Sequence, residues 1–446
     1  MLTVIQNERI TRVGPGTPMG AVFRQFWLPV CTSRELPGPD SNPLRVRLVG
    51  EPLVAFRDTQ GNVGVLHENC PHRGASLALG RVEEGGIRCL YHGWKFAANG
   101  KTLDMPNCSS SAIRSKIGAR AYTVHEEGGL VWAYLGPQEA APPFTRYAFM
   151  DAPESHRAVV RINVDCNYLQ LTEGGFDSSH VGILHSDIAR PGWMDANVSV
   201  SQDPEHPGAL AVDDNDPELE LTETDFGFYY AAIRRGGKDD GGADRLNVRV
   251  VPFMMPSTRM IPSPTTLFTV FETPADDHHT STFIVVHGKQ AVDRNRVLAI
   301  LGLDKGDYWR EADNHFRASW DNGFGQDRMR MKTAWTGFSG LEQEDAIISL
   351  SMGTIYDRSQ EHLVAADRAV ASLRRILLRA AARVEGGSKL KLPADLTDVG
   401  APDVFLRTND HRAWRELTPH HWLDTVPTND IDETKDVAGS ESSGRE

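Results

Sequence analysis

Short stretches in the first third of the chain alternate hydrophobic and polar positions. Period-two patterns of this kind, bounded by Gly- and Asn-containing turns, predict strands over 44–49, 52–56, 63–66, 119–125 and 129–134. The short separations favour tight turns between antiparallel neighbours. We therefore expect a small all-β unit over 29–137, and the turn-rich segment 136–143 marks its end.

The pattern changes after residue 143. Residues 165–185 are predicted to be helix plus turn, and further alternation predicts a larger antiparallel sheet with strands over 197–200, 218–224, 226–234, 245–251, 266–272 and 280–287. Pro-, Asp- and Gly-rich loops are expected at 201–217 and 236–244. Helices are predicted over 292–303, 307–321 and, most clearly, 360–384, where Gly386-Gly387 follows. The expected class is α+β, with no internal repeat.

Composition and charge narrow the function classes. Hydrophobic residues make up 40% of the 446 residues, which is enough for a sizeable core. The formal charge of −13, from 47 basic and 60 acidic residues, disfavours nucleic-acid binding. No apolar run reaches the ~18 residues of a membrane span, and the N-terminus does not resemble an export signal, so a cytoplasmic location without membrane association is expected. The acidic tail 430–446 is expected to be disordered.

The five cysteines do not form an obvious disulfide framework, because they are few, odd in number and widely spaced. Cys31, Cys108 and Cys166 are expected to be small buried hydrophobic residues. The other two lie beside histidines, in Cys70-Pro71-His72 and Cys89-Leu90-Tyr91-His92. We call these two cysteine–histidine segments hooks, and each of them offers one thiolate and one imidazole as possible metal ligands.

A tetrahedral zinc ion could use the same four side chains, but the commonest zinc pattern pairs Cys with Cys and His with His. Mixed hooks suit a two-iron cluster in which the thiolates bind one iron and the imidazoles bind the other. Replacing two thiolates by neutral imidazoles raises the reduction potential of such a cluster. Structural zinc, and with it a zinc-stabilised binding protein, remains the alternative.

The arrangement Cys-x-His followed by Cys-x-x-His-Gly-Trp resembles the Rieske [2Fe–2S] motif. The resemblance implies that Cys70 and Cys89 bind one iron and that His72 and His92 bind the other. It also identifies the all-β unit over 29–137 with a Rieske domain.

A second group of candidate ligands lies at Asp177, His180 and His185. Two histidines five residues apart fall ~140° apart on an ideal helix, so a shared metal requires the helix to bend or end between them, and Gly182 permits that. Asp177 and His180 can lie on one helical face. Taken alone, each histidine is more often a packed or surface residue than a ligand.

Downstream of a Rieske motif, Asp-x-x-His-x(4)-His resembles the iron site of the Rieske non-haem oxygenases. The resemblance implies that His180 and His185 bind Fe(II) with one distant carboxylate, which leaves coordination positions open for O2. We assign Asp345, because its acidic stretch resembles the family's carboxylate position. If this segment is helical, Glu342 shares the face of Asp345 and is the stronger rival, whereas Glu344 points ~100° away.

The same resemblance gives Asp177 a coupling role rather than a ligand role. It implies that Asp177 bridges His180 and a neighbouring subunit's His92, because a carboxylate can hold two imidazole rings by hydrogen bonds. Such a bridge requires a head-to-tail homo-oligomer, a trimer or a hexamer.

The segments 14–20, 173–180 and 352–358 resemble the phthalate dioxygenase branch, which includes phthalate, chlorobenzoate and phenoxybenzoate oxygenases. The resemblance implies a helix-grip-like catalytic domain over 144–429, with residues 1–28 packed on it. It also implies a separate flavin/[2Fe–2S] reductase that delivers NADH electrons. This chain has no Gly-x-Gly-x-x-Gly loop and no plant-type four-cysteine cluster, so it needs such a partner.

The expected activity is dioxygenation of an aromatic carboxylate. The alternatives are an O- or N-demethylating monooxygenase and, less favoured, a Rieske electron carrier. Arg249 is the predicted substrate anchor, since Arg binds carboxylates in bidentate fashion; an outward-facing strand arginine is the alternative. The resemblance to this branch implies a second basic residue in strand 226–234, and the middle of that strand contains none. If the anchor is missing there, a monocarboxylate or a larger diaryl acid is expected instead of phthalate.

Overall fold

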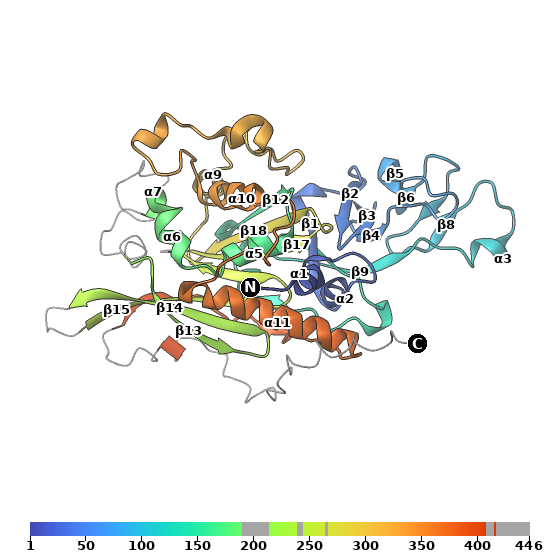
Figure 1. Ribbon diagram of the computed structural model, residues 1–446. Helices are drawn as coiled ribbons and strands as arrows, with labels where there is room; N and C mark the ends of the chain where they lie inside the picture. The colour runs from blue at the N-terminus through green and yellow to red at the C-terminus, as the bar shows by residue number, and fades with distance from the viewer. Residues whose placement is uncertain (190–213, 239–243, 264–265, 407–413, 416–446) are drawn as a thin grey trace, which may run out of the picture.

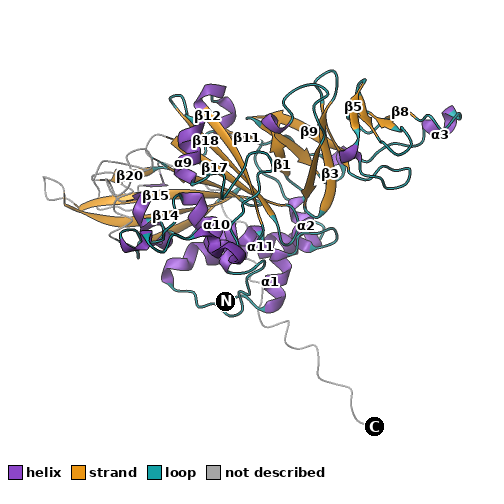
Figure 2. Cartoon of the chain, turned by 90° about the horizontal axis from the view of Figure 1, so that it is seen from above, coloured by secondary structure: helices purple, strands orange, loops and turns teal. Residues whose placement is uncertain are grey.

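The computed structural model describes residues 1–189, 214–238, 244–263, 266–406 and 414–415 (Figure 1). The predicted strand 197–200, most of the predicted loop 201–217 and the tail 430–446 lie outside the described residues. The described elements form a β-rich unit followed by a larger α+β unit, which confirms the expected fold class (Figure 2).

The first unit contains two antiparallel sheets. The larger has the order β1-β10-β9-β4-β3-β2 and is built from β1 (Trp27–Thr32), β2 (Leu44–Leu48), β3 (Glu51–Arg57), β4 (Val63–His67), β9 (Ala121–Glu127) and β10 (Leu130–Tyr134). The smaller consists of β5 (Arg81–Glu83), β6 (Gly86–Arg88), β7 (Lys95–Phe96) and β8 (Thr102–Asp104). All five predicted strands are confirmed. The unpredicted ones were too short to show alternation or, like β1, are buried on nearly every residue.

The second unit is organised around an eight-stranded antiparallel sheet. Its order is β12-β18-β17-β16-β15-β14-β13, with β20 beside β15. The strands are β12 (Arg157–Val164), β13 (Glu218–Glu223), β14 (Gly227–Lys238), β15 (Asp244–Met254), β16 (Thr258–Pro262), β17 (Thr266–Pro274), β18 (Thr280–Gly288) and β20 (Asp403–Leu406). Because β14 and β15 extend further than predicted, the loop expected at 236–244 is partly strand; residues 239–243 lie outside the described part.

Helices lie around this sheet. They are α1 (Val4–Thr11), α2 (Pro18–Phe23), α5 (Tyr168–Gly174), α6 (Ser179–Ile183), α7 (Ser186–Ala189), α9 (Arg294–Leu301), α10 (Leu341–Ser351) and α11 (Arg368–Glu385). Short elements complete the description: α3 (Ser111–Arg114), α4 (Ala148–Asp151), and the parallel pair β11 (Arg146–Tyr147) and β19 (Asp395–Leu396). The helix-plus-turn prediction for 165–185 is confirmed. The long C-terminal helix is present but begins at Arg368, later than predicted.

The predicted helix over 307–321 is wrong. This segment instead hydrogen-bonds with β12: the Asn163 N–H donates to the Asn314 carbonyl and the Phe316 N–H donates to the Asn163 carbonyl. Trp309 also donates from Nε1 to the carbonyl of Arg161 on that strand. Pairing with a sheet edge has therefore overridden a spacing of apolar residues that is also compatible with a helix.

The large sheet is buried on both faces because alternate residues of its strands enter different cores. Tyr230 of β14 packs in a core that includes α11, whereas Tyr229 packs in a core that includes Trp132 of β10. Two further helices, α9 and α10, share a core with β12, β17 and β18 (Figure 1). The α5–α6 segment and α10 thereby lie beside the same sheet, and this placement builds the candidate site.

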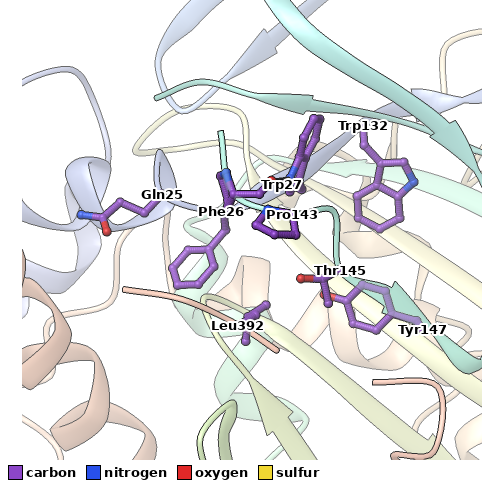
Figure 3. Close-up of a pocket in the computed structure, with 9 residues that line it drawn as sticks. Gln25, Phe26, Trp27, Trp132, Pro143, Thr145, Tyr147 and Leu392 are labelled. Atoms are coloured by element: carbon purple, nitrogen blue, oxygen red, sulfur yellow. Dashed lines mark hydrogen bonds between the residues drawn. The ribbon is translucent and has the colours of Figure 1, made fainter. Parts of the chain in front are cut away.

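The junction between the two units is closely packed. Figure 3 shows Trp27, Trp132, Tyr147 and Leu392 around a small pocket at this junction. Its volume is about 10 Å³. A space of that size holds no more than about one water molecule. A second link comes from the turn between β2 and β3, where the Val49 N–H donates to the Pro274 carbonyl. The two units therefore form one continuous body.

Candidate metal centres

The two cysteine–histidine hooks have the same backbone geometry. In each, a glycine N–H donates to the carbonyl of the cysteine four residues earlier: Gly74 to Cys70, and Gly93 to Cys89. The two glycines have φ values of 73° and 76°, a left-handed conformation that favours glycine. The hooks follow β4 and β6, so the first unit presents two matching loops toward one point.

The four side chains of the hooks gather as the sequence predicted. Cys70 and Cys89 are each 2% exposed, and their thiols lie close enough to interact. The rings of His72 and His92 have centroids 4.3 Å apart. Both Nδ1 atoms are buried without a hydrogen-bond partner among the described residues. Unpaired buried nitrogens are rare in native proteins, so two thiols and two unpaired imidazole nitrogens fit a mixed-ligand cluster.

Aromatic neighbours hold the histidine rings. Trp94 stacks on His72, with centroids 4.4 Å apart and an interplanar angle of 12°, and its Nε1 donates to Asn107. Tyr91 lies against His92 at 3.9 Å and is itself 56% exposed. The imidazole side of this centre therefore lies near the protein surface.

The second centre brings together His180 of α6, His185 from the turn after α6, and Asp345 of α10. Their candidate ligand atoms all lie within 4.8 Å of one another. Asp345 Oδ1 is 3.6 Å from His180 Nε2 and 3.1 Å from His185 Nε2. The helix ends at Ile183, just after Gly182, so the two rings can converge despite their unfavourable spacing on a continuous helix.

A carboxylate lies beside the other nitrogen of each ring. His185 Nδ1 is 2.8 Å from Glu344 Oε2, and Glu344, 1% exposed, also accepts a hydrogen bond from Thr336. His180 Nδ1 is 3.7 Å from Asp177 Oδ2, longer than a hydrogen bond. Both histidines thus turn Nε2 toward Asp345. Carboxylates behind ligating histidines commonly fix the tautomer and ring orientation at metal sites.

The ionisable groups of this centre shift one another's pKa values strongly. The pKa of His185 rises to about 10: burial alone would lower it, but the negative charges and hydrogen bonds of Asp345 and Glu344 outweigh that effect. The pKa of Asp345 falls to about 2, again against the effect of burial, because of His185 and His180. A divalent ion would take the place of the His185 proton, and two imidazoles with one carboxylate fit Fe(II).

The rival acids occupy other positions. Glu344 contacts the far side of His185, so it supports a ligand instead of competing with Asp345. Glu342 shares the Asp345 side of α10, as its spacing predicted, and it is 5% exposed. Burial and the neighbouring charges of Glu272 and Asp345 raise the pKa of Glu342 to about 8. Among the described residues, the compact ligand group contains Asp345 and not Glu342.

This centre opens into a cavity of about 470 Å³. Most of its wall is apolar and comes from β15–β18 and α9, including Val251, Ile261, Phe268, Val270, Ile284, Val286 and Val297. The polar side chains of this wall include Tyr230, Arg249, Arg259, Asp293, Arg296 and Glu342. An apolar chamber with a few polar groups beside a metal site is the usual form of a small-molecule site.

Arg249 faces this cavity. It is half-buried, and its Nη1 donates to Asp403 Oδ2 at 3.2 Å and to the Pro262 carbonyl at 3.4 Å. The sequence did not predict the Asp403 pairing, because the two residues are far apart along the chain and meet only when β20 joins β15.

Arg234 was also missed by sequence reasoning. It lies at the far end of the predicted strand, is 1% exposed, and donates to both the carbonyl and Oγ of Ser178. It therefore fixes the turn that carries Asp177. The middle of that strand, from Phe228 to Ala231, is fully buried and contains no basic residue.

Comparison with known proteins shows the family to which this chain belongs. A family model described as the Rieske [2Fe-2S] domain matches residues 26–122, and one described as LigXa C-terminal domain like matches 133–422. The chain is 38% identical to the phthalate 4,5-dioxygenase oxygenase subunit of Pseudomonas putida, over 87% of this chain and 88% of that protein. This protein belongs to the Rieske non-haem iron oxygenases.

Two further relatives indicate the branch of the family that this oxygenase resembles. It is 32% identical to the 3-chlorobenzoate-3,4-dioxygenase oxygenase subunit of Comamonas testosteroni, covering 88% of this chain and 91% of the relative. It is 29% identical to the 5,5'-dehydrodivanillate O-demethylase oxygenase subunit of a Sphingobium strain, covering 88% and 83%. The resemblance to the phthalate dioxygenase branch is confirmed.

Solved structures share the fold of this oxygenase. Dicamba monooxygenase bound to dicamba superposes with a TM-score of 0.56 at 20% identity, over 82% of this chain and 99% of that one. The match to the Rieske family and the site formed by two histidines and an aspartate show that the oxygenase uses a [2Fe–2S] cluster and Fe(II). Within the described residues, no helix has the length and apolar composition to cross a bilayer.

Proposed function

We propose that this protein is the oxygenase component of a two-component dioxygenase that inserts O2 into an aromatic carboxylate. A separate flavin/[2Fe–2S] reductase would deliver the NADH electrons. The observation that carries the proposal is the two-histidine, one-carboxylate centre opening into a cavity with apolar walls and an arginine. Apolar walls suit an aromatic ring, and an arginine suits its carboxylate.

The residues divide between the two metal groups. We assign Cys70, Cys89, His72 and His92 to the cluster, and His180, His185 and Asp345 to the iron. When bound, the cluster relays single electrons and the iron activates O2. The domain limits follow the same division, with the Rieske domain over 29–137 and the catalytic domain over 144–429.

The protein's own groups prepare the site. Glu344 orients His185, and the largely apolar wall offers a surface on which an aromatic ring can pack. Arg249 uses only Nη1 in its bonds with described residues, so Nε and Nη2 can meet a substrate carboxylate. Because Asp403 already balances part of the charge of Arg249, a single carboxylate is favoured over two.

The two centres of one chain lie far apart. The cluster hooks belong to the end of the molecule that carries β5–β8, whereas α6 and α10 lie in the other unit (Figure 1). Figure 2 shows the same separation between β5 and β8 at one end and α10 in the other unit. Electron transfer therefore suits a head-to-tail homo-oligomer, a trimer or hexamer. In it, Asp177 would join His180 to His92 of the neighbouring subunit. The position of Asp177 beside His180 supports this role.

The second candidate is an O- or N-demethylating monooxygenase. The O-demethylase relative, which covers 88% of this chain, favours it. The same cavity would accept a methoxylated aromatic acid with its methyl group toward the iron.

One experiment separates the two. The purified oxygenase, a generic reductase, NADH and isotopically labelled O2 are incubated with benzoates, phthalates, phenoxybenzoates and methoxybenzoates, and products are identified by mass. A ring product with two labelled oxygens supports dioxygenation. Formaldehyde with a demethylated product supports the second candidate. NADH consumption without a product from any aromatic acid rejects the proposed substrate class.

A further inference from the structure

One acidic side chain in the cavity has no assigned partner. Glu342 lies in the first turn of α10, three residues before Asp345, and is 5% exposed while lining the chamber. No hydrogen bond or ion pair connects it to another residue in the described part of the chain. A carboxyl group this deeply buried almost always has a hydrogen-bond or ion-pair partner. We therefore expect a ligand that enters the cavity to form a hydrogen bond with Glu342.

The neighbouring acids already have partners. Glu272, which is fully buried, accepts hydrogen bonds from Arg259 and Thr282. Glu344 accepts from Thr336 and contacts His185. Arg259, one of three arginines that line the chamber, donates from Nη1 to Glu272, so its charge attracts Glu342 without a hydrogen bond between the two. Glu342 is thus distinguished from the surrounding acids by facing the chamber without such a contact.

The chemistry of a carboxyl group defines what could meet it. An ionised carboxylate only accepts hydrogen bonds, whereas a protonated carboxyl both donates and accepts. A hydroxyl group can donate to the first form and accept from or donate to the second. An ether oxygen only accepts, and a ring C–H bond does neither to a useful extent. A hydroxyl is therefore the substituent that pairs with Glu342 in either state.

We propose that Glu342 binds a hydroxyl group of the substrate beside the iron site, so that this oxygenase selects hydroxylated aromatic acids. The apolar wall holds the ring, and Arg249 faces the same chamber for the carboxylate. The inference rests on the proposed function, since it takes the substrate to be an aromatic acid. It adds a specificity-determining residue and narrows the substrate class.

Binding, measured without turnover, tests this. The anaerobic iron-loaded oxygenase is titrated calorimetrically with benzoate, the three hydroxybenzoates and the three matching methoxybenzoates. Because a pKa of about 8 leaves the Glu342 carboxyl mostly protonated at neutral pH, the range for a hydrogen bond to a neutral group applies. We therefore expect one hydroxybenzoate to bind about 2- to 10-fold more tightly than benzoate, and more tightly than its methoxy counterpart, whose ether oxygen can only accept. Equal affinities for the three types of ligand in the wild-type protein would overturn the inference. Failure of every aromatic acid to bind would instead reject the proposed function.

Substitutions of Glu342 test whether this residue causes the preference for a hydroxyl group. Glu342→Leu and Glu342→Met should abolish the hydroxyl preference while keeping iron content and cluster absorption, and Glu342→Gln, which can donate and accept, should restore part of it. Asp293→Asn is the matched control, because Asp293 is an exposed acid lining the same cavity. It should leave the preference unchanged. A preference that survives in iron-loaded Glu342→Leu or Glu342→Met, or that disappears in Asp293→Asn, would contradict the assignment. The comparison of hydroxybenzoate and methoxybenzoate affinities in the wild-type protein tests the inference even if an apolar variant fails to fold.

Discussion

The Nδ1 atom of His185 lies 2.8 Å from the carboxylate of Glu344, while its Nε2 atom lies 3.1 Å from Asp345. One ring is therefore held between two carboxylates from adjacent positions of α10. In the proposed site, Glu344 would set the tautomer and orientation of His185, and Asp345 would bind the same metal ion as His185. This relationship explains how two consecutive acids on one helix can have different tasks.

Glu344→Gln should weaken iron binding by about tenfold, the lower end of the range for loss of such a supporting contact. The amide keeps the shape and one acceptor but loses the negative charge that favours the ligating form of His185. Competition with a ferrous chelator measures the change. Glu311→Gln, at an exposed surface ion pair, is the control. Unchanged iron affinity in Glu344→Gln would show that the contact is only structural.

His180→Ala should lose the mononuclear iron and keep the brown cluster, because the two centres use separate ligands. Analysis should give about three irons and about two sulfides per chain in the wild type, and about two of each in the variant. Visible absorption and metal analysis measure this. Simultaneous loss of both metal groups would argue against independent sites.

Asp177→Asn should retain both metal groups but slow the transfer of electrons between them. Asp177 lies beside His180 without being among the ligand atoms of the iron site. The rate at which O2 reoxidises the reduced cluster in the presence of substrate is measured by rapid mixing. In the variant this rate should be at least about tenfold lower, as expected for loss of a contact that orients ligands. A wild-type rate in the variant would refute the bridging role.

Arg249→Gln should raise KM for carboxylate substrates by about 10- to 100-fold, the value of a charge-assisted hydrogen bond, with a smaller effect on kcat. Binding of the corresponding neutral amides should change little. Arg383→Gln, an exposed arginine on α11, is the control. Equal losses for acids and amides would indicate damage to the cavity instead of loss of carboxylate recognition.

Glu173 links α5 to the C-terminal region through buried Arg358 and Arg374. Burial opposes ionisation of Glu173, but the two guanidinium charges outweigh it and lower its pKa. A lowered folded pKa means that the ionised group stabilises the fold above the ordinary glutamate pKa, and that this contribution is lost as pH falls through the folded value. Acid should therefore loosen the helix that precedes the iron ligands.

The Glu173→Gln variant tests this contribution. Removing one partner of a buried ion pair should cost about 3–5 kcal/mol of unfolding free energy at pH 7. The difference from the wild type should shrink as the pH falls from the ordinary glutamate pKa through the lower folded pKa of Glu173. Urea unfolding at several pH values measures it. A pH-independent difference would show that packing, and not charge, causes the loss.

The sequence by itself determined the parts of this protein that depend on near neighbours. Each cysteine–histidine hook is a contiguous loop with its own glycine, so the four candidate ligands could be identified from spacing, and the resemblance to a known motif then suggested the kind of cluster. The alternating strands were predictable for the same reason, because the side-chain period of a strand is local.

Only the tertiary structure decided the long-range relationships. The packing of α10 against α5 and the α6 region separated the roles of Glu342, Glu344 and Asp345. The joining of β20 to β15 gave Arg249 its partner, and pairing with β12 made 307–321 irregular. Spacing along the chain fixes which residues share a local face, but the choice among several acids depends on which one packing brings to the two histidines.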